Sequence, residues 1–489
     1  MVSSTRSAVL VGIEAMEVTV EVQTRGSKER FALVGLPDTA VREARHRVRS
    51  AMEQSGIGFP TGAVTVNLGP GNVQKSGSGF DLAIALGITA SSRPDHLGAA
   101  DVVSVGELGL DGDVRPSRGG LAAALVARDL GIPCLLAPET AAEAAHVVGA
   151  DVRAVRTLSE AVAVAAGRPA ALVDPVRRAR EQTKPEDLAD VRGQPVARRA
   201  LEIAAAGGHH LLLSGPPGCG KTMLARRLPG ILPELAPDEE LEVACVWSAA
   251  DRHRPPGSAR PFRSPHHSAS VAAVLGGGSG VPVPGEISLA HGGVLFLDEM
   301  GEYPQNLLDA FRQPMEQGSV VIARRGATVT YPARCQIVAA TNPCPCGFRG
   351  DRARACRCDE PSFARYRRRL SGPLLDRFDL RVAVARPERL DGPRGEPSES
   401  VRARVVAARR RQADRGWLNR DLPGHVMDEA PVAPAARAML VEAVDRGVLT
   451  GRGYDRVRRV AMTIADLEAV DVVDPGHIGE AMALRAGDS

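Results

Sequence analysis

Lysine and aromatic residues are scarce in this chain of 489 residues. Lys28, Lys75, Lys184 and Lys221 are its only lysines among 61 basic residues, so arginine carries almost all of the positive charge. Aromatic residues make up 3% of the chain and hydrophobic residues 44%, so we expect cores built from Ala, Val, Leu and Ile. A lysine that persists against this bias indicates a position where arginine is unsuitable.

Long apolar runs and a secretion signal are also missing. The N-terminal segment MVSSTRSAVLVGIEAMEV has no basic start followed by an apolar run and a cleavage site, and no run of about 18 apolar residues predicts a membrane span. The eight cysteines are therefore expected to be reduced thiols in the cytoplasm. A net charge of +3 indicates no partner, so a nucleic-acid surface would need local clustering of arginine.

Composition and periodicity divide the chain into four parts and predict a multidomain α/β protein. Residues 1–168 mix strand patterns (VTVEVQTRG, AVTVNLG) with helical segments (AVREARHRVRSAMEQSG, GGLAAALVARDLG), which predicts an α/β or α+β domain. Residues 169–186 are polar and interrupted by proline, which is typical of a linker. Residues 187–394 contain the short apolar strands HLLLSG, GGVLFLDE and CQIVAAT of an α/β core, and residues 395–489 are rich in Ala and Arg and predicted to be helical.

A phosphate-binding loop is the clearest motif. GPPGCGKT matches the pattern G-x-x-x-x-G-K-[ST], follows a predicted strand and opens a predicted helix. Backbone N–H groups and the helix N-terminus favour phosphate there. Lys221 is expected to contact the β- and γ-phosphates of ATP, and Thr222 to hold Mg²⁺. The nucleotide-binding residues are predicted to be Gly215, Pro216, Pro217, Gly218, Cys219, Gly220, Lys221 and Thr222.

Two further apolar strands end in polar residues. VLFLDE ends in Asp298 and Glu299; Asp298 is expected to orient Mg²⁺ through water, and Glu299 to polarise the attacking water. Asn342 ends the strand in CQIVAATNP, where its side chain is expected to hold the attacking water or the γ-phosphate. Together these residues predict ATP hydrolysis.

Several long segments resemble the magnesium-chelatase-like AAA+ family of bacteria, and within it the YifB/ComM group. They are DVRGQPVARRALEIAAAGGHHLLLSGPPGCGKT, FRSPHHSAS, GGGSGVPVPGEISLAHGGVLFLDE, TNPCPCG and SGPLLDRFDL, and the resemblance covers nearly the whole chain. It implies a Lon-protease-like α+β N-terminal domain, an AAA+ P-loop core and a helical C-terminal lid.

The same resemblance implies roles for two arginines. Arg377 in LLDRFDL resembles an arginine finger, which enters the neighbouring subunit's site and stabilises charge there, so a homo-hexameric ring is expected. Arg452 in TGRGYDRVRRVAMTIADL resembles the second sensor of the lid, with Arg456 as the alternative.

Two insertions resemble pore elements of the family. In VVIARRGATVTYPA, short β-runs flank Arg324, Arg325 and Gly326, and a basic hairpin tip suits a phosphate backbone; an ordinary solvated turn is the alternative. GGGSGVPVPGE resembles the other pore insertion. His266 and His267 in FRSPHHSAS are candidates for contacting DNA, binding phosphate or packing.

The Lon-like part lacks the expected proteolytic residues. Lon relatives use a Ser nucleophile and a Lys base. In the segment that begins at Lys75, the nucleophile position aligns with Gly79, with Ser78 as the alternative, and the base position aligns with Ala122. Since no lysine lies between Lys75 and Lys184, we predict no peptidase activity and a role as a ring scaffold or DNA-contacting collar.

Four cysteines form a C-x-C…C-x-C pattern within fifteen residues: Cys344, Cys346, Cys356 and Cys358. Their number and type match a tetrahedral Zn²⁺ site, although the spacing is not the usual C-x₂-C; a cluster of unliganded thiols is the alternative. The other four cysteines are predicted to be isolated thiols.

The resemblance implies a helicase that uses ATP to drive branch migration when incoming single strands recombine with the chromosome, with single-stranded or branched DNA as its partner. A magnesium-chelatase-type motor subunit is one alternative, although the Lon-like block resembles ComM-type proteins instead. A protein-remodelling motor is the other, although the usual aromatic pore-loop signature is not evident.

Overall fold

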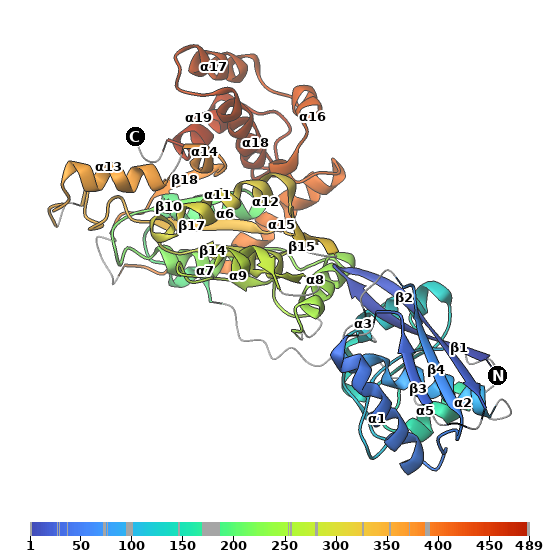
Figure 1. Cartoon of the computed structure of the whole chain (residues 1–489). Coiled ribbons are helices and arrows are strands. Elements are labelled where there is room, and N and C mark those ends of the chain that lie inside the picture. The colour runs from blue at the N-terminus through green and yellow to red at the C-terminus, as the bar shows by residue number, and fades with distance from the viewer. Residues whose placement is uncertain are drawn as a thin grey trace.

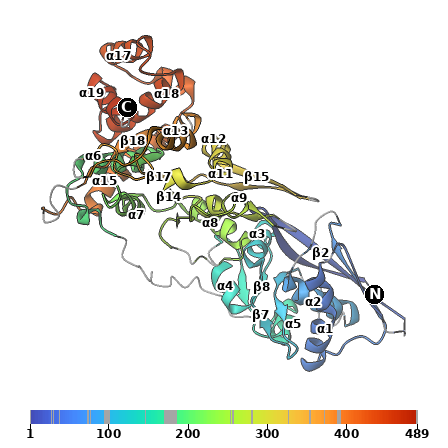
Figure 2. The same cartoon turned by 60° about the vertical axis from the view of Figure 1, so that its left-hand side comes forward.

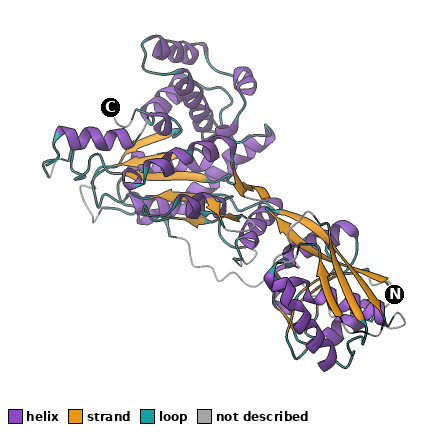
Figure 3. Cartoon of the chain, in the orientation of Figure 1, coloured by secondary structure: helices purple, strands orange, loops and turns teal. Residues whose placement is uncertain are grey.

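Two α/β bodies follow one another along the chain in a computed structural model of the protein (Figure 1). The structure describes residues 2–26, 28, 30–36, 38–71, 75, 77–93, 101–144, 147–168, 186–252, 254, 257–278, 282–324, 327–351, 354–370, 372–386 and 392–486. The predicted linker, residues 169–186, lies outside this part of the chain except for Glu186. Figure 3 shows the strands of the two main sheets in separate bodies.

The first body holds a seven-stranded sheet in the order β3-β4-β2-β1-β5-β8-β9. Its strands are β1 (Val2–Val11), β2 (Glu14–Arg25), β3 (Arg30–Val34), β4 (Ala63–Gly69), β5 (Val103–Val105), β8 (Cys134–Leu136) and β9 (Val152–Ala154). β1 and β2 form a long antiparallel hairpin in which Val18, Val20 and Val22 point into the core, as the alternating sequence pattern predicts.

Helices cover both faces of this sheet. They are α1 (Thr39–Gln54), α2 (Asp81–Ser92), α3 (Gly120–Leu130), α4 (Pro138–Ala144) and α5 (Leu158–Ala165). α1, α2 and α5 share one hydrophobic core, and α3 and α4 share another. The helices predicted from the sequence over α1 and α3 are confirmed, and the turn after α1 contains Gly56 with φ of 72°.

The second body contains a five-stranded sheet in the order β11-β14-β17-β10-β18, in which all neighbouring strands are parallel. The strands are β10 (Leu211–Ser214), β11 (Phe262–Arg263), β14 (Val294–Leu297), β17 (Gln336–Thr341) and β18 (Leu380–Ala383). Leu211 and Leu213 enter one core, whereas Leu212 enters the other. Both faces are therefore buried, which explains the continuous apolar runs that predicted β10, β14 and β17.

The helices of the second body are distributed over both faces. α6 (Pro195–Gly207) and α7 (Lys221–Ile231) pack with the C-terminal helices, and the other face carries α11 (Gln305–Ala310) and α12 (Arg312–Gln317). The remaining helices are α8 (Pro237–Ala249), α9 (Val271–Leu275), α10 (Glu286–Leu289), α13 (Glu360–Arg369) and α14 (Gly372–Leu375).

The C-terminal part is helical, as predicted for residues after 395. It comprises α15 (Ser398–Asp414), α16 (Gly424–Glu429), α17 (Pro434–Asp445), α18 (Gly451–Leu467) and α19 (Pro475–Ala483). α15 and α18 pack against α6, so this part is joined to the core. Among the described residues, no helix is both long and apolar enough to cross a membrane.

An antiparallel hairpin of β15 (Ser319–Arg324) and β16 (Ala327–Pro332) interrupts the chain between β14 and β17. A short pair, β12 (Gly276–Gly277) with β13 (Val283–Pro284), lies against β15. Seen from a second direction, the β15 hairpin and the β1–β2 hairpin approach one another where the two bodies meet (Figure 2). The turn at Gly12 contacts β16 there, because a Cβ added to Gly12 would lie 3.0 Å from Val329 Cγ1.

Candidate functional site

The phosphate-binding loop joins β10 to α7, as the sequence predicts. Gly215 packs so closely on Val384, the residue after β18, that an added Cβ would overlap the Val384 carbonyl oxygen. Gly218 and Gly220 have φ angles of 77° and 96°, a region that side chains rarely adopt. These glycines are therefore required by the loop geometry itself.

Lys221 connects this loop to the end of β17. Its Nζ donates to the carbonyl oxygens of Gly215 (2.6 Å) and Pro216 (3.1 Å) and to Asn342 Oδ1 (3.1 Å). Burial lowers the pKa of Lys221. Lys221 and Asn342, 121 residues apart, thus form one cluster.

Thr222, Asp298 and Glu299 complete the cluster. Thr222 Oγ1 donates to Asp298 Oδ2 at 2.9 Å, and the Glu299 amide donates to Asp298 Oδ1 at 3.0 Å. A hydroxyl and a carboxylate side by side match the hard oxygen ligands of Mg²⁺, which would neutralise phosphate charge at this place. Glu299 has φ of 50° and ψ of 47°, a left-handed conformation that is costly for a glutamate and is typical of functional sites.

All five predicted residues lie at one edge of the sheet. Ser214, Leu297 and Thr341 end β10, β14 and β17, which are parallel neighbours, so the residues that follow them meet at the carboxyl edge. This edge is where ligands bind in open α/β sheets.

The arginines predicted to assist hydrolysis are not part of the Lys221 cluster in this chain. Arg377 is 9% exposed, and its guanidinium contacts Glu316 Oε1 (2.6 Å) and the Pro373 carbonyl (2.6 Å). Burial lowers the pKa of Arg377. Within the described part of the chain, Arg377, Arg452 and Arg456 make no polar contact with Lys221 or Glu299.

Arg452 and Arg456 lie on α18 and line a polar surface pocket that also contains Glu316. Arg456 donates to the Arg377 carbonyl (3.1 Å) and pairs with buried Asp379. Arg456, the alternative to Arg452 as the second sensor, is therefore already engaged in a structural ion pair.

His267 lies beside Glu299, with 3.6 Å between His267 Nδ1 and Glu299 Oε2. The rings of His266 and His267 are 4.1 Å apart, and His266 Nδ1 is 2.7 Å from the Ser268 hydroxyl. The two histidine rings thus pack on each other beside Glu299, one of the predicted nucleotide-site residues. Contacts of these histidines with DNA or phosphate stay predictions.

Tyr366 on α13 is a residue that the sequence analysis missed. Its hydroxyl donates to the Asn342 carbonyl (3.0 Å) and is 2.9 Å from Thr341 Oγ1. Gly301 packs directly under the ring. Tyr366 therefore fixes the turn that carries Asn342; its rarity, as one of four tyrosines, is the only sequence signal that could have drawn attention to it.

The predicted hairpin is confirmed as secondary structure. Val320 and Ile322 of β15 and Val329 and Tyr331 of β16 are buried, whereas Arg324 at the end of β15 is exposed. Arg325, the other predicted DNA contact, lies outside the described residues.

The Lon-like motif has no catalytic pair. Ser78 Oγ donates to the Glu107 carboxylate, and Lys75 Nζ donates to the Pro70 carbonyl. Gly79 and Ala122 are buried. Ser78 therefore contacts an acid and not a lysine base.

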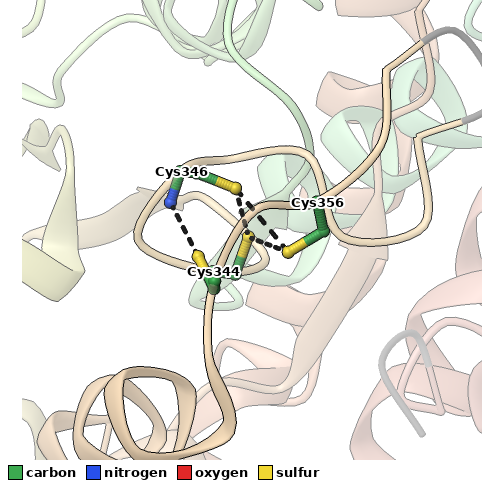
Figure 4. Close-up of side chains that lie close together, drawn as sticks. Cys344, Cys346 and Cys356 are labelled. Carbon is green, nitrogen blue, oxygen red and sulfur yellow. Dashed lines mark hydrogen bonds between the residues drawn. The ribbon is translucent and has the colours of Figure 1, made fainter.

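The sulfur atoms of Cys344, Cys346 and Cys356 point toward one another (Figure 4). All four Sγ atoms, those of Cys344, Cys346, Cys356 and Cys358, lie within 4.8 Å of one another. Backbone N–H groups of Arg357 and Phe348 lower the pKa of Cys346 to about 6, which favours a thiolate, the form that binds metals. The other four cysteines are buried and belong to no such group among the described residues.

Comparison with known proteins identifies the family. Family models match the chain at residues 187–391 ("Magnesium chelatase, subunit ChlI"), 20–141 ("Subunit ChlI of Mg-chelatase") and 395–485 ("Magnesium chelatase, subunit ChlI C-terminal"). YifB of Escherichia coli K12 is 41% identical over 496 residues, which cover 99% of this chain and 96% of YifB.

The chain belongs to the magnesium-chelatase-like YifB/ComM family. Another relative is competence protein ComM of Haemophilus influenzae, 41% identical over 500 residues, with 97% of this chain and 96% of ComM covered. A shorter stretch of 133 residues is 36% identical to Lon protease 2 of Bacillus subtilis and covers 25% of the chain and 24% of that protease. The Lon likeness of this YifB/ComM member is thus partial.

Proposed function

We propose that this chain is an ATP-driven AAA+ motor that acts on DNA in the cytoplasm as a homo-hexameric ring. Its function is that of a helicase promoting branch migration during recombination or uptake of single-stranded DNA. The name of the ComM relative supports a role connected with competence. Lys221, Thr222, Asp298, Glu299 and Asn342 form the hydrolytic site.

The observation that carries this proposal is the position of the β15–β16 hairpin. It follows β14, α11 and α12 along the chain and directly precedes β17; β14 ends beside Asp298 and Glu299, and β17 ends beside Asn342. Buried side chains fix its base, and the Tyr331 hydroxyl donates to the Pro282 carbonyl (2.7 Å) of the second insertion. Arg324 is exposed at the far end. The hairpin thus presents an exposed basic residue, which suits a phosphate backbone, within the domain that carries the hydrolytic site.

In the proposed reaction, Lys221 binds the β- and γ-phosphates of ATP and Asn342 holds the attacking water or the γ-phosphate. Thr222 and Asp298 would hold Mg²⁺, which would neutralise phosphate charge. Glu299 accepts the proton of the attacking water, and the exposed side chain suits contact with solvent. Arg377 serves the site of a neighbouring subunit as an arginine finger, and Arg452 acts as the second sensor of the lid.

Branch migration of a synthetic four-way DNA junction by the purified chain, with ATP and Mg²⁺, tests the proposal. We expect movement of the junction by the wild type and none by Lys221→Ala, together with ATPase stimulation by single-stranded or branched DNA. Stimulation only by an unfolded protein substrate would instead support the protein-remodelling motor, and dependence on a porphyrin-binding partner would support the chelatase-type subunit.

Mixed rings test the action of Arg377 between subunits. Lys221→Ala and Arg377→Ala are each expected to abolish ATP hydrolysis alone. When the two variants are mixed, some interfaces combine an intact Lys221 with an intact Arg377, so part of the activity should return. Failure to recover activity, in mixtures shown to co-assemble, would assign Arg377 to its own chain.

A further inference from the structure

The spacing of the cysteine sulfurs matches a metal centre and not disulfides. Cys344 Sγ lies 3.4 Å from Cys346 Sγ and 3.7 Å from Cys356 Sγ, and Cys346 Sγ lies 3.6 Å from Cys356 Sγ. A disulfide needs about 2.05 Å between sulfurs. A tetrahedron with Zn–S bonds of about 2.3 Å has sulfur–sulfur edges of about 3.8 Å. These three separations, with Cys358 Sγ within 4.8 Å of the other sulfur atoms, therefore suit four thiolates around one Zn²⁺.

The backbone around the sulfur atoms also suits metal binding. The Cys346 amide donates to Cys358 Sγ at 3.3 Å, and the Gly347 amide donates to the Cys344 carbonyl at 2.9 Å, which closes a tight turn. Gly347 has φ of 81°, so glycine is favoured at this turn. N–H donors to sulfur stabilise the thiolate form and orient metal ligands.

The turn at Gly347 presses on the nucleotide site. A Cβ added to Gly347 would lie 2.6 Å from Pro217 Cδ in the phosphate-binding loop and 3.8 Å from Asn342 Cγ. Cys344 is only two residues beyond Asn342 and is fully buried. The turn between the clustered cysteines therefore packs against both the phosphate-binding loop and the residue expected to hold the attacking water.

Arginine and phenylalanine side chains pack around the turn that contains Gly347. The Arg354 guanidinium lies 5.2 Å from the Phe348 ring and that of Arg386 lies 5.9 Å from it, while Arg349 stacks on Phe363 of α13 at 3.6 Å. These contacts join the cysteine turn to α13, which also carries Tyr366. The metal would thus lie inside a connected layer and not on a free loop.

We propose that Cys344, Cys346, Cys356 and Cys358 bind one Zn²⁺, and that this ion holds Gly347 against Pro217 and thereby positions Asn342 and the phosphate-binding loop for ATP hydrolysis. The proposal rests on the nucleotide site of the proposed function but not on DNA as the substrate. Zinc here is structural, because four protein thiolates leave no coordination position for a substrate.

Metal analysis of the purified full chain tests the binding. We expect one zinc per chain, and replacement by Co²⁺ should give the thiolate charge-transfer and tetrahedral d–d absorption bands of a four-sulfur site. Cys356→Ala should lose the ion, whereas Cys356→His should keep it, since imidazole is also a zinc ligand. Cys134→Ala, a buried cysteine outside the cluster, is the matched control and should keep one zinc. A folded wild-type chain that remains zinc-free when supplied with Zn²⁺ would overturn the site.

The link to hydrolysis is tested separately by kinetics without DNA. Gly347→Ala retains all four ligands but presses on Pro217, so we expect one zinc per chain with kcat/KM for ATP reduced about tenfold, because small misplacements at a reacting centre are costly. Zinc-depleted Cys356→Ala should lose activity similarly, and Cys356→His should recover it. Unchanged kcat and KM in both Gly347→Ala and zinc-free protein would refute the positioning role, while leaving the ATPase and DNA assays to judge the proposed function.

Discussion

At the scale of single residues, the nucleotide site depends on how neighbouring side chains hold each other. Lys221 is fixed by two carbonyls and Asn342, and Thr222 by Asp298. Glu299 is different, since its side chain is about half exposed and lies 3.6 Å from His267 Nδ1. Its freedom suits a proton acceptor better than a structural residue.

The proposed role of Glu299 as the catalytic base gives a direct prediction. Glu299→Gln keeps the shape of the side chain but removes the base, so ATP should bind normally while kcat falls by about 10²–10⁴. Nucleotide binding and steady-state hydrolysis measure the two effects. Glu302→Gln, at an exposed position in the following turn, is the matched control. Normal hydrolysis by Glu299→Gln would remove Glu299 from the catalytic role.

Buried His210 predicts a pH-dependent stability. Its Nδ1 accepts from the Ile337 amide (3.0 Å), and burial lowers its pKa to about 3. The unfolded chain, with a histidine pKa of about 6.5, binds this proton first as pH falls, so the folded state loses stability from about pH 6.5 down to about pH 3. Between pH 6.5 and 5 this amounts to about 2 kcal/mol.

His210→Asn preserves an acceptor for the Ile337 amide but does not titrate. Its free energy of unfolding, measured by denaturant titration between pH 5 and pH 7, should therefore fall less steeply toward acid than that of the wild type. His425→Asn, at an exposed site, should keep the wild-type slope. Equal slopes for all three proteins would contradict a neutral buried His210.

At the scale of elements, the β15–β16 hairpin separates a packed base from an exposed basic end. Arg324→Ala should leave basal ATPase unchanged but weaken DNA binding, and the slope of log affinity against log salt should fall by about one unit, as for loss of one phosphate contact. Fluorescence anisotropy at several salt concentrations measures this. Arg446→Ala, at an exposed arginine directly after α17, is the control. Equal effects of both variants would indicate a non-specific effect of the lost charge.

The loop that carries Ser78 predicts a protein without peptidase activity. Ser78 donates to Glu107, and the position of a lysine base is occupied by buried Ala122. Incubation with unfolded casein and with a serine-reactive fluorophosphonate probe should give neither cleavage nor labelling. Labelling that disappears in Ser78→Ala would show an active nucleophile and contradict this prediction.

At the scale of the whole molecule, the two bodies share a small interface. Ile13, in the β1–β2 turn, packs against the cores of both bodies, and Cys245 of α8 enters the core around α3. An ion pair between Arg118 and Asp251 lies nearby. The first body therefore contacts both α8 and the hairpin that we propose to meet DNA.

Weakening this interface should affect coupling more than hydrolysis. Ile13→Asp places a charge in a half-buried apolar contact. The contact between the two bodies should be weakened by about 1–3 kcal/mol. We expect reduced stimulation of the ATPase by DNA with unchanged basal activity. Val148→Asp, at an exposed site of the same body, is the control. Full stimulation of Ile13→Asp would show that the first body does not influence the hairpin.

The sequence by itself determined the nucleotide site and the main strands of the core. The phosphate-binding loop is a local pattern, and the runs before Glu299 and Asn342 are parallel strands whose carboxyl ends must meet at one edge. The cysteine pattern likewise predicted a four-thiol group, because its members are close in the sequence.

Only the tertiary structure decided which segments contact each other when they are far apart in the sequence, because no helical or strand periodicity links them. Tyr366 beneath Asn342, His267 beside Glu299, Arg377 on Glu316 and Gly347 against Pro217 each join separate elements. Helical and strand periodicities determine which face of an element is buried but not which element covers it. Such pairings depend on packing of the whole core, so they became visible only when the chain was folded.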